Sequence, residues 1–319
     1  MRVVRVVAIE EHFGTPDLLA GRDWSWLPAS PHDRLLDLGA GRLAAMDSGG
    51  IDMQVLSAVA PAAQELPAET AVAVAARLNN ELYETVLAHP DRFAAFAALP
   101  TGVPDAAAEE LERAVTELGF VGTLVNGTTG GRFLDDPMFA PILDTAARLA
   151  VPIYLHPGPP PKPVADAYYT GLPASINQAL ALTGYGWHYE TSLHAVRMIV
   201  AGVFDRWPGL RLILGHLGEG IPFHLSRIDD ALTPLAGHLK KPVGAYVRDN
   251  FWITTSGYCY DGPFRLAREV FGDDRVMFSV DFPFADNRQA RDWLDCLDLS
   301  EDVRAKVAHG TADALLGLR

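Results

Sequence analysis

The chain places acids and imidazoles directly after short apolar runs, which is a placement suited to binding a metal ion. The first run, "VVRVVAI", is followed by Glu10, Glu11 and His12. Residues two apart on a strand point to the same side, so Glu10 and His12 can be aimed at one ion. Glu11 is expected to point the other way, toward a helix or a salt-bridge partner.

Three further apolar runs end in residues of the same kind. His156 follows "VPIYL", His216 follows "RLILG" with Glu219 three residues later, and Asp281 follows "VMFSV". Imidazoles suit zinc, and carboxylate oxygens also admit manganese, so we expect one divalent ion, zinc first and manganese second. The predicted metal ligands are Glu10, His12, His156 and Asp281.

His216 and Glu219 have a second interpretation, because a turn with glycines separates them. His216 could be a further ligand, or the two could form a hydrogen-bonded pair facing the substrate, with Glu219 fixing the imidazole tautomer. The remaining seven histidines lie mostly in helical or loop patterns, where structural or solvated roles are expected. They are His32, His89, His188, His194, His224, His238 and His309.

Eight predicted strands alternate with amphipathic helical patterns and would position these residues. The strands are predicted at Val3–Ile9, Met53–Ala58, Phe93–Leu99, Val121–Val125, Pro152–Leu155, Arg211–Leu214, Phe251–Thr255 and Val276–Val280. This alternation predicts an α/β fold, a (β/α)8 TIM barrel forming one domain over residues 1–319 with loop insertions, in which all strand ends meet at one rim. A doubly wound open sheet is the alternative, but no Gly-rich phosphate turn follows the first strand.

Composition excludes some classes of partner. The 319 residues carry a net charge of −14, from 26 basic and 40 acidic side chains, and such a surface repels nucleic acid. The two cysteines, Cys259 and Cys296, are expected to be inert thiols in a reducing compartment. We find no signal peptide and no apolar window of membrane-span length, so a cytoplasmic protein without a membrane partner is expected.

Six segments resemble a known family: "AIEEHF", "GFVGTLVNG", "YLHPG", "FDRWPGLRLILGHLGEGIPF", "TTSG" and "MFSVDFPF". They are similar to the metal-dependent decarboxylase branch of the amidohydrolase superfamily, which includes the γ-resorcylate, 2,3-dihydroxybenzoate and 5-carboxyvanillate decarboxylases. Aminocarboxymuconate-semialdehyde decarboxylase is a more distant member. The E-x-H start, in place of the H-x-H of hydrolytic relatives, points toward the benzoate decarboxylases.

The resemblance implies a non-oxidative decarboxylase that releases CO2 from an aromatic acid with an ortho hydroxyl. It also implies a metal-dependent barrel without an organic cofactor, assembled as a homodimer or homotetramer. It matches the four ligands named above, and it makes Asp281 the candidate proton donor. His216 and Glu219 match a pair beside the substrate, and Asn126 and Arg227 match polar positions near the pocket. Aromatic walls are expected from Trp24, Tyr185, Trp187 and Phe284.

One departure from the family lies close to the expected pocket. The loop after His156 reads "PGPPPKP", where resorcylate-type members carry a more polar, arginine-containing stretch. This departure bears on the substrate more than on the reaction class. The alternative function is a metal-dependent hydrolase or hydratase acting on a small cyclic or carbonyl substrate. A barrel that only binds a ligand would require lost metal ligands, and none is missing.

Overall fold

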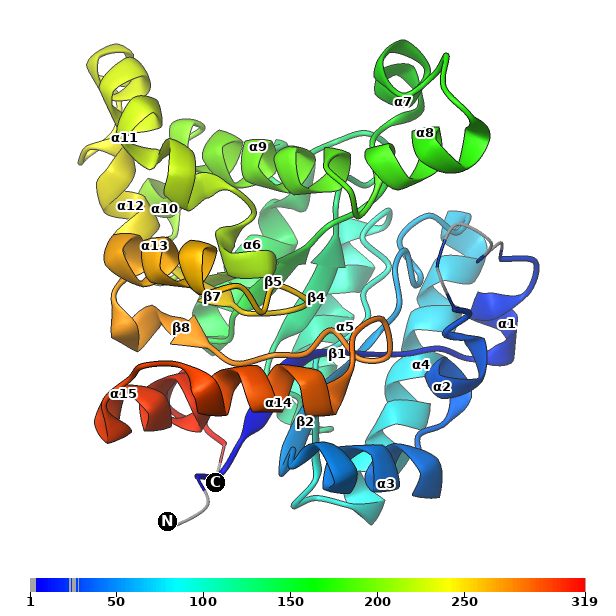
Figure 1. The fold of residues 1–319 in the computed structure, drawn as a ribbon. Coiled ribbons are helices and arrows are strands. Elements are labelled where there is room, and N and C mark those ends of the chain that lie inside the picture. The colour runs from blue at the N-terminus through cyan, green and yellow to red at the C-terminus, as the bar shows by residue number, and fades with distance from the viewer. Residues whose placement is uncertain (1–3, 23, 25–26, 28, 319) are drawn as a thin grey trace.

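The computed structural model describes residues 4–22, 24, 27 and 29–318, and its strands form a barrel surrounded by helices (Figure 1). The strands are β1 (Val7–Phe13), β2 (Met53–Ala58), β3 (Phe93–Ala95), β4 (Thr123–Asn126), β5 (Ile153–His156), β6 (Leu212–Leu214), β7 (Phe251–Thr254) and β8 (Val276–Met277). Every strand pair in the structure is parallel. The predicted (β/α)8 barrel is therefore confirmed.

Hydrogen bonds outside the regular ladders close the barrel between its two sheets. The ladders run in the orders β1-β2-β3 and β4-β5-β6-β7-β8. A parallel bridge between Ala97 and Thr123 connects the end of β3 to β4. On the other side, the Ile9 and Glu10 N–H groups donate to the Ser279 hydroxyl at 3.2 and 2.6 Å. These contacts bring the first strand against the segment that follows the last one.

Helices cover the outside of the barrel, and most alternate with the strands (Figure 1). The α-helices are α1 (Pro16–Leu19), α2 (His32–Leu36), α3 (Ala40–Gly49), α4 (Ala68–Ala88), α5 (Pro104–Thr116), α6 (Ala140–Leu149), α7 (Lys162–Tyr168), α8 (Ala174–Ala181), α9 (Gly186–Val200), α10 (Val203–Arg206), α11 (Ile221–Leu232), α12 (Val243–Asn250), α13 (Asp261–Phe271), α14 (Asn287–Cys296), α15 (Glu301–Ala305) and α16 (Thr311–Leu316). Between β5 and α9, the insertion that contains α7 and α8 extends beyond the barrel at the upper right of Figure 1.

A β-bulge in β1 changes which residues face the barrel interior. The register with β2 shifts between Ala8 and Glu11. Val7, before the shift, and Ile9, within it, pack in the apolar cluster inside the barrel. After it, Phe13 packs with Ala8 in the cluster between strands and helices. An extra residue in a strand reverses the alternation, so the even-numbered side chains beyond the bulge can turn inward.

The observed strand boundaries differ from the predicted ones. The first strand was predicted at Val3–Ile9, but β1 continues through the polar residues to Phe13, because a fully buried strand can carry paired polar side chains. Val3 lies outside the described residues. The strands predicted at Phe93–Leu99 and Val276–Val280 are shorter, because their later residues bond to loops or side chains instead of a neighbouring ladder.

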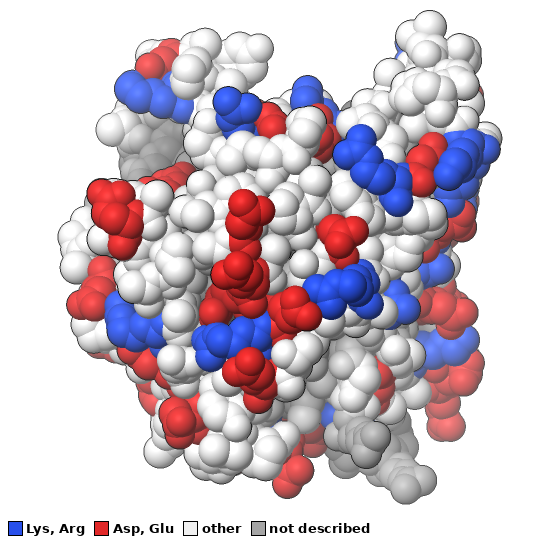
Figure 2. Space-filling view, turned by 180° about the vertical axis from the view of Figure 1, so that it is seen from behind, with Lys and Arg blue, Asp and Glu red and all other residues white. Residues whose placement is uncertain are grey.

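Acidic and basic side chains are interspersed on the face shown in Figure 2. The ends of the described chain lie close together, because Arg5 pairs with Asp313 at 2.6 Å. Among the residues that the structure describes, no helix has both the length and the apolar character needed to cross a membrane.

Candidate metal centre and its cavity

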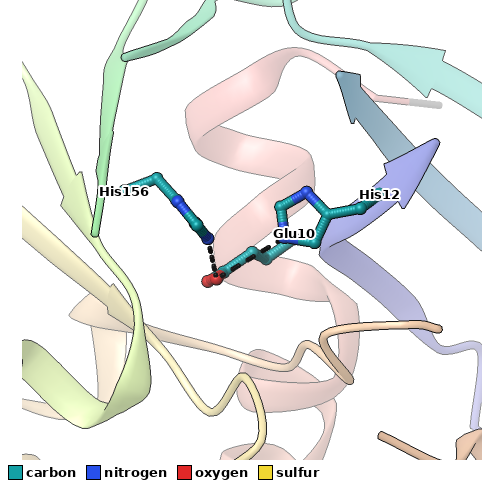
Figure 3. Close-up of side chains that lie close together, drawn as sticks. All are labelled: Glu10, His12 and His156. Carbon is teal, nitrogen blue, oxygen red and sulfur yellow. Dashed lines mark ion pairs between the residues drawn. The ribbon is translucent and has the colours of Figure 1, made fainter. Parts of the chain in front are cut away.

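The carboxyl ends of the strands bring the predicted ligands together at one rim. Figure 3 shows the imidazoles of His12, from β1, and His156, from β5, directed at the Glu10 carboxylate. Glu10 Oε1 lies 3.2 Å from His156 Nε2 and 4.0 Å from His12 Nε2. Beyond β8, Asp281 places Oδ1 3.3 Å from His12 Nε2. Side chains from both ends of the sequence therefore share one small volume.

Two atoms of this cluster are buried without a hydrogen-bond partner among the described residues: Glu10 Oε1 and His12 Nε2. Leaving a buried polar atom unpaired costs about 1–3 kcal/mol, so two such atoms in one cluster of ligand-type side chains point to a bound partner. Ligand atoms of Glu10, His12 and His156 lie within 4.8 Å of one another, as do those of Glu10, His216 and Asp281. Imidazole nitrogens and carboxylate oxygens at this spacing fit a divalent metal ion.

The neighbouring imidazoles control the charge of Glu10. Burial by itself raises the pKa of this carboxyl, but His216, His156 and His12 outweigh burial and hold the pKa well below its ordinary value. Glu10 is therefore ionised in the buried site, as a metal ligand must be.

Hydroxyl groups hold the other oxygen of Glu10. Oε2 accepts hydrogen bonds from Tyr154, from Ser256 at 2.5 Å and from Thr254 at 3.4 Å. Burial and the charge of Glu10 raise the pKa of Tyr154, which keeps its hydroxyl a donor. These donors leave Oε1 to face the imidazoles. Sequence reasoning missed all three, although Tyr154 lies two residues before His156 on the same side of its strand.

His216 and Glu219 lie in the loop that follows β6, where the short helix η2 (His216–Gly218) begins. His216, Leu217 and Glu219 have positive φ angles of 48°, 57° and 58°. Such angles are rare for residues with side chains and occur where the surrounding structure imposes them. Glu219 Oε1 accepts from His216 Nδ1 at 2.6 Å, which turns His216 Nε2 toward Glu10 Oε1 and Asp281 Oδ2, at 3.6 and 3.9 Å.

This pair is held as an ion pair. Burial lowers the pKa of His216, but Glu219 and Glu10 outweigh burial and raise it well above the ordinary value. Burial raises the pKa of Glu219, but His216 and His188 outweigh it and lower the pKa. A protonated His216 thus presents an Nε2–H donor to the rim of the barrel.

His188 lies at the same site, which differs from the structural or solvated role expected for it. On α9, its Nδ1 donates to Glu219 Oε2 at 2.5 Å, so one carboxylate accepts from two imidazoles. His188 Nε2 lies 3.2 Å from both Trp187 Nε1 and the Tyr258 hydroxyl. A histidine inside a helical pattern has no sequence feature that distinguishes it from a structural or solvated histidine, so His188 could not be predicted at the site.

A cavity of about 640 Å³ opens next to the metal ligands, within the size range of small-molecule sites. Trp24, Trp187 and Phe284, three of the predicted aromatic walls, line it. The Phe284 ring centre lies 5.8 Å from that of His12 and 6.2 Å from that of Trp24. Among the described residues, the rest of the lining consists of apolar and aromatic residues, Thr183, four histidines, Asp281 and one arginine, Arg22. A flat apolar molecule with an anionic group fits this mixture.

Three residues predicted at the pocket lie outside the cavity lining in the described structure. Asn126, at the end of β4, bonds through its backbone N–H to the Gln64 side chain at 2.6 Å. Arg227 lines a separate groove between α9 and α11, because it lies roughly two turns into α11. Tyr185 is half exposed and stacks on Tyr189, with ring centres 4.3 Å apart.

The chain is similar to known metal-dependent decarboxylases in both sequence and structure. A γ-resorcylate decarboxylase of Rhodococcus jostii (strain RHA1) is 41% identical, with 98% of each chain covered. The structure of a 2,6-dihydroxybenzoate decarboxylase in complex with 2,6-dihydroxybenzoate is 37% identical, covers 99% of both chains and has a TM-score of 0.88.

A dihydroxybenzoic acid decarboxylase from Polaromonas sp. JS666, solved with manganese and the inhibitor 2-nitroresorcinol, is also 37% identical. It covers 99% of this chain and 97% of its own, with a TM-score of 0.89. The amidohydrolase family model matches residues 9–318, nearly the whole chain, which contains the metal centre just described. The chain therefore belongs to the amidohydrolase family.

Proposed function

We propose that this chain is a metal-dependent, non-oxidative decarboxylase that releases CO2 from an aromatic acid of the ortho-hydroxybenzoate type. The observation that carries the proposal is the buried cluster with two unpartnered ligand atoms, which opens into a cavity with aromatic walls. Relatives with this activity are similar over almost the full length of the chain.

Glu10, His12, His156 and Asp281 would hold one divalent ion. When bound, the ion supplies positive charge that orients the substrate carboxylate and phenolic oxygen and stabilises charge developing on them. The two imidazoles suit zinc and the two carboxylates also admit manganese, which the Polaromonas relative contains. Metal analysis of protein purified without added ions distinguishes the two.

Asp281 is the proposed proton donor. Its side chain is partly exposed and lines the cavity, whereas that of Glu10 is fully buried. As the carboxylate, Asp281 would first take up one proton from solvent through the cavity that it lines, and would then transfer it to the ring carbon that carries the substrate carboxylate. The carbon–carbon bond then breaks, its electron pair returns to the ring, and CO2 leaves. The net reaction consumes one proton and restores the aromatic ring.

His216 and Glu219 are proposed to orient the substrate. The protonated His216 donates from Nε2 to the phenolic or carboxylate oxygen, while Glu219 holds Nδ1–H and so fixes the direction of the ring. Trp24 and Trp187 would sandwich or border the aromatic ring from the walls of the cavity. We also propose Asn126 and Arg227 as substrate-binding residues. Because neither lines the described cavity, this role would require contacts outside that lining.

We propose one catalytic barrel over residues 1–319, acting on a small aromatic acid, without an organic cofactor. Assembly as a homodimer or homotetramer and a cytoplasmic location are likewise proposed.

The test is CO2 release from a panel of hydroxybenzoates by the metal-loaded protein. We expect release from at least one acid with a hydroxyl ortho to the carboxylate and none from its meta isomer, since only an ortho hydroxyl lies close enough to the carboxylate for both oxygens to face the metal-site residues. Absence of release across the panel, together with turnover of a lactone, an ester or an alkene hydration substrate, would overturn the proposal in favour of the hydrolase or hydratase alternative.

A further inference from the structure

Glu11 is fully buried on β1 and points away from the metal site, yet donors surround its carboxylate. Oε1 accepts from the Ser279 hydroxyl and the Val280 N–H, both at 2.9 Å. Oε2 accepts from the Phe282 N–H at 3.1 Å and from the Gln54 side-chain amide at 3.3 Å. Three of these four donors therefore belong to the segment that follows β8.

The two backbone donors flank Asp281. This residue has a φ of 73°, in the left-handed region that side-chain-bearing residues rarely adopt unless their surroundings impose it. Because the N–H groups of Val280 and Phe282 are held by one carboxylate, a rotation that relaxes Asp281 breaks at least one of these bonds. The His12 N–H also donates to the Phe282 carbonyl at 2.7 Å, which ties the same segment to β1.

Arg42 and Gln54 hold the Glu11 carboxylate in place. Arg42 is buried on α3, and its Nη1 donates to Gln54 Oε1 at 3.2 Å. The Gln54 amide nitrogen therefore faces Glu11. Arg42 Nη2 donates to the His12 carbonyl at 2.5 Å. The guanidinium is therefore bonded to β1, the strand that carries the predicted ligands Glu10 and His12. Burial raises the pKa of Glu11 to about 8, while the hydrogen bonds from Val280, Ser279 and Phe282 and the nearby charge of Arg42 favour its ionised form.

We propose that Glu11 is a positioning residue that clamps the backbone on both sides of Asp281 and thereby holds this carboxylate in the metal centre. Among the described residues, Glu11 is absent from the lining of the cavity, so it acts through Asp281 and not on the substrate. The expected effect on turnover rests on the proposed function, whereas the expected effect on metal binding does not.

Glu11→Gln tests the clamp because it preserves the shape but leaves one acceptor oxygen. The Ser279 hydroxyl can rotate, but the N–H groups of Val280 and Phe282 cannot become acceptors. In E11Q, one of them must face an amide N–H group. We expect the Mn²⁺ dissociation constant, measured by calorimetry, to rise about 10- to 100-fold, as for other losses of groups that orient metal ligands. We also expect a changed visible spectrum of the Co²⁺-loaded protein and a lower kcat at similar KM.

Glu110→Gln is the matched control. Glu110 is a buried carboxylate on α5 that accepts from Asn79 at 2.6 Å and from Arg113 at 2.7 Å. Its replacement removes a buried acid of the same kind away from the metal centre. E110Q is expected to bind Mn²⁺ with wild-type affinity and to keep the wild-type Co²⁺ spectrum, even where its stability falls.

A folded E11Q with wild-type Mn²⁺ affinity and an unchanged Co²⁺ spectrum would overturn the proposal. If E11Q does not fold, the variant Gln54→Met provides the test, because it removes one donor to Glu11. We then expect Mn²⁺ binding to be weaker by about 10-fold, the low end of the range for such groups. Wild-type affinity in folded Q54M would also overturn the clamp. If the wild-type protein decarboxylates no hydroxybenzoate but E11Q still weakens Mn²⁺ binding, the proposed function fails and the clamp stands.

Discussion

The interior of the barrel contains two layers of opposite character, although the same strands build both. The apolar layer consists of tightly buried side chains: Val7, Ile9, Met53, Val55, Ala94, Phe96, Leu124, Ile213 and Met277. The metal-site layer holds Glu10, His12, His156 and Asp281, and two of its atoms have no hydrogen-bond partner within the part of the chain that the structure describes. Tyr154 connects the layers, because its ring packs in the apolar cluster and its hydroxyl bonds to Glu10.

The difference shows how one barrel separates stability from chemistry. The apolar layer contributes to the free energy of unfolding through burial and close packing. The metal-site layer gathers charged groups and atoms without a hydrogen-bond partner, so its burial contributes less to folding than burial of apolar side chains does. Substitutions in the apolar layer should therefore lower the free energy of unfolding and leave metal affinity unchanged. Substitutions in the metal-site layer should lower metal affinity and leave the free energy of unfolding nearly unchanged.

The largest expected effect is that of Asp281→Ala in the metal-site layer. Loss of a ligand and of the proposed proton donor should reduce turnover by about 10³- to 10⁴-fold. The metal-free protein should unfold at about the same denaturant concentration, because Asp281 lies close both to Glu10, which repels it, and to His216, which attracts it. Turnover is measured as CO2 release, and stability by unfolding in guanidinium chloride with a chelator present.

Asp292→Ala is the control for that prediction. Asp292 is exposed on α14 and pairs with Arg288 at 2.9 Å, a surface ion pair of the kind that contributes little. D292A should keep full turnover. Retained activity in D281A would remove Asp281 as the proton donor, and a strongly destabilised metal-free D281A would contradict the contrast between the layers.

Ile213→Ala tests the other layer. Ile213 is fully buried on β6, and its truncation leaves a cavity, so the free energy of unfolding should fall by about 2–5 kcal/mol. Mn²⁺ affinity and the kcat of the folded protein should stay within about 2-fold, because the removed atoms lie in the apolar layer. The measurements are chemical unfolding and calorimetric titration, with Leu87→Ala at an exposed helix position as control. A large loss of Mn²⁺ affinity at unchanged stability would contradict the contrast between the apolar layer and the metal-site layer.

The smallest effect concerns His194, which lies on α9 outside both layers. Burial, followed by the charge of Arg197, lowers its pKa to about 3, and its Nε2 accepts the Leu134 N–H at 2.7 Å. The unfolded chain takes up this proton below pH 6.5 and the folded one does not, so stability falls as pH decreases from 6.5 toward 3.

Between pH 7 and pH 5, His194 should therefore account for a loss of about 2 kcal/mol in the free energy of unfolding. His194→Gln keeps an acceptor for Leu134 and cannot titrate, so its loss over this interval should be smaller by that amount. Guanidinium unfolding at both pH values, with a chelator present, measures the difference. Equal losses in both proteins would show that His194 does not carry this pH dependence.

Much of the fold and of the metal centre could be predicted from sequence because both depend on simple periodicities. Alternating apolar runs and helical patterns predicted the barrel, and the geometry of a parallel barrel predicted that distant strand ends meet. Arg227 illustrates the limit: it follows the "GHLGEG" motif closely in sequence, but α11 carries it to another groove. Helix direction in space is set by packing, which residue spacing alone does not reveal.

The sequence by itself determined which chemical groups follow each apolar run, and hence that acids and imidazoles gather at one end of a barrel. Only the tertiary structure decided their partners. The β1 bulge turns Glu10 and His12 inward, His188 reaches Glu219 from a helix, and Glu11 holds the backbone around Asp281. These contacts join residues far apart in the chain, and their hydrogen bonds depend on positions of a few tenths of an ångström that no local pattern encodes.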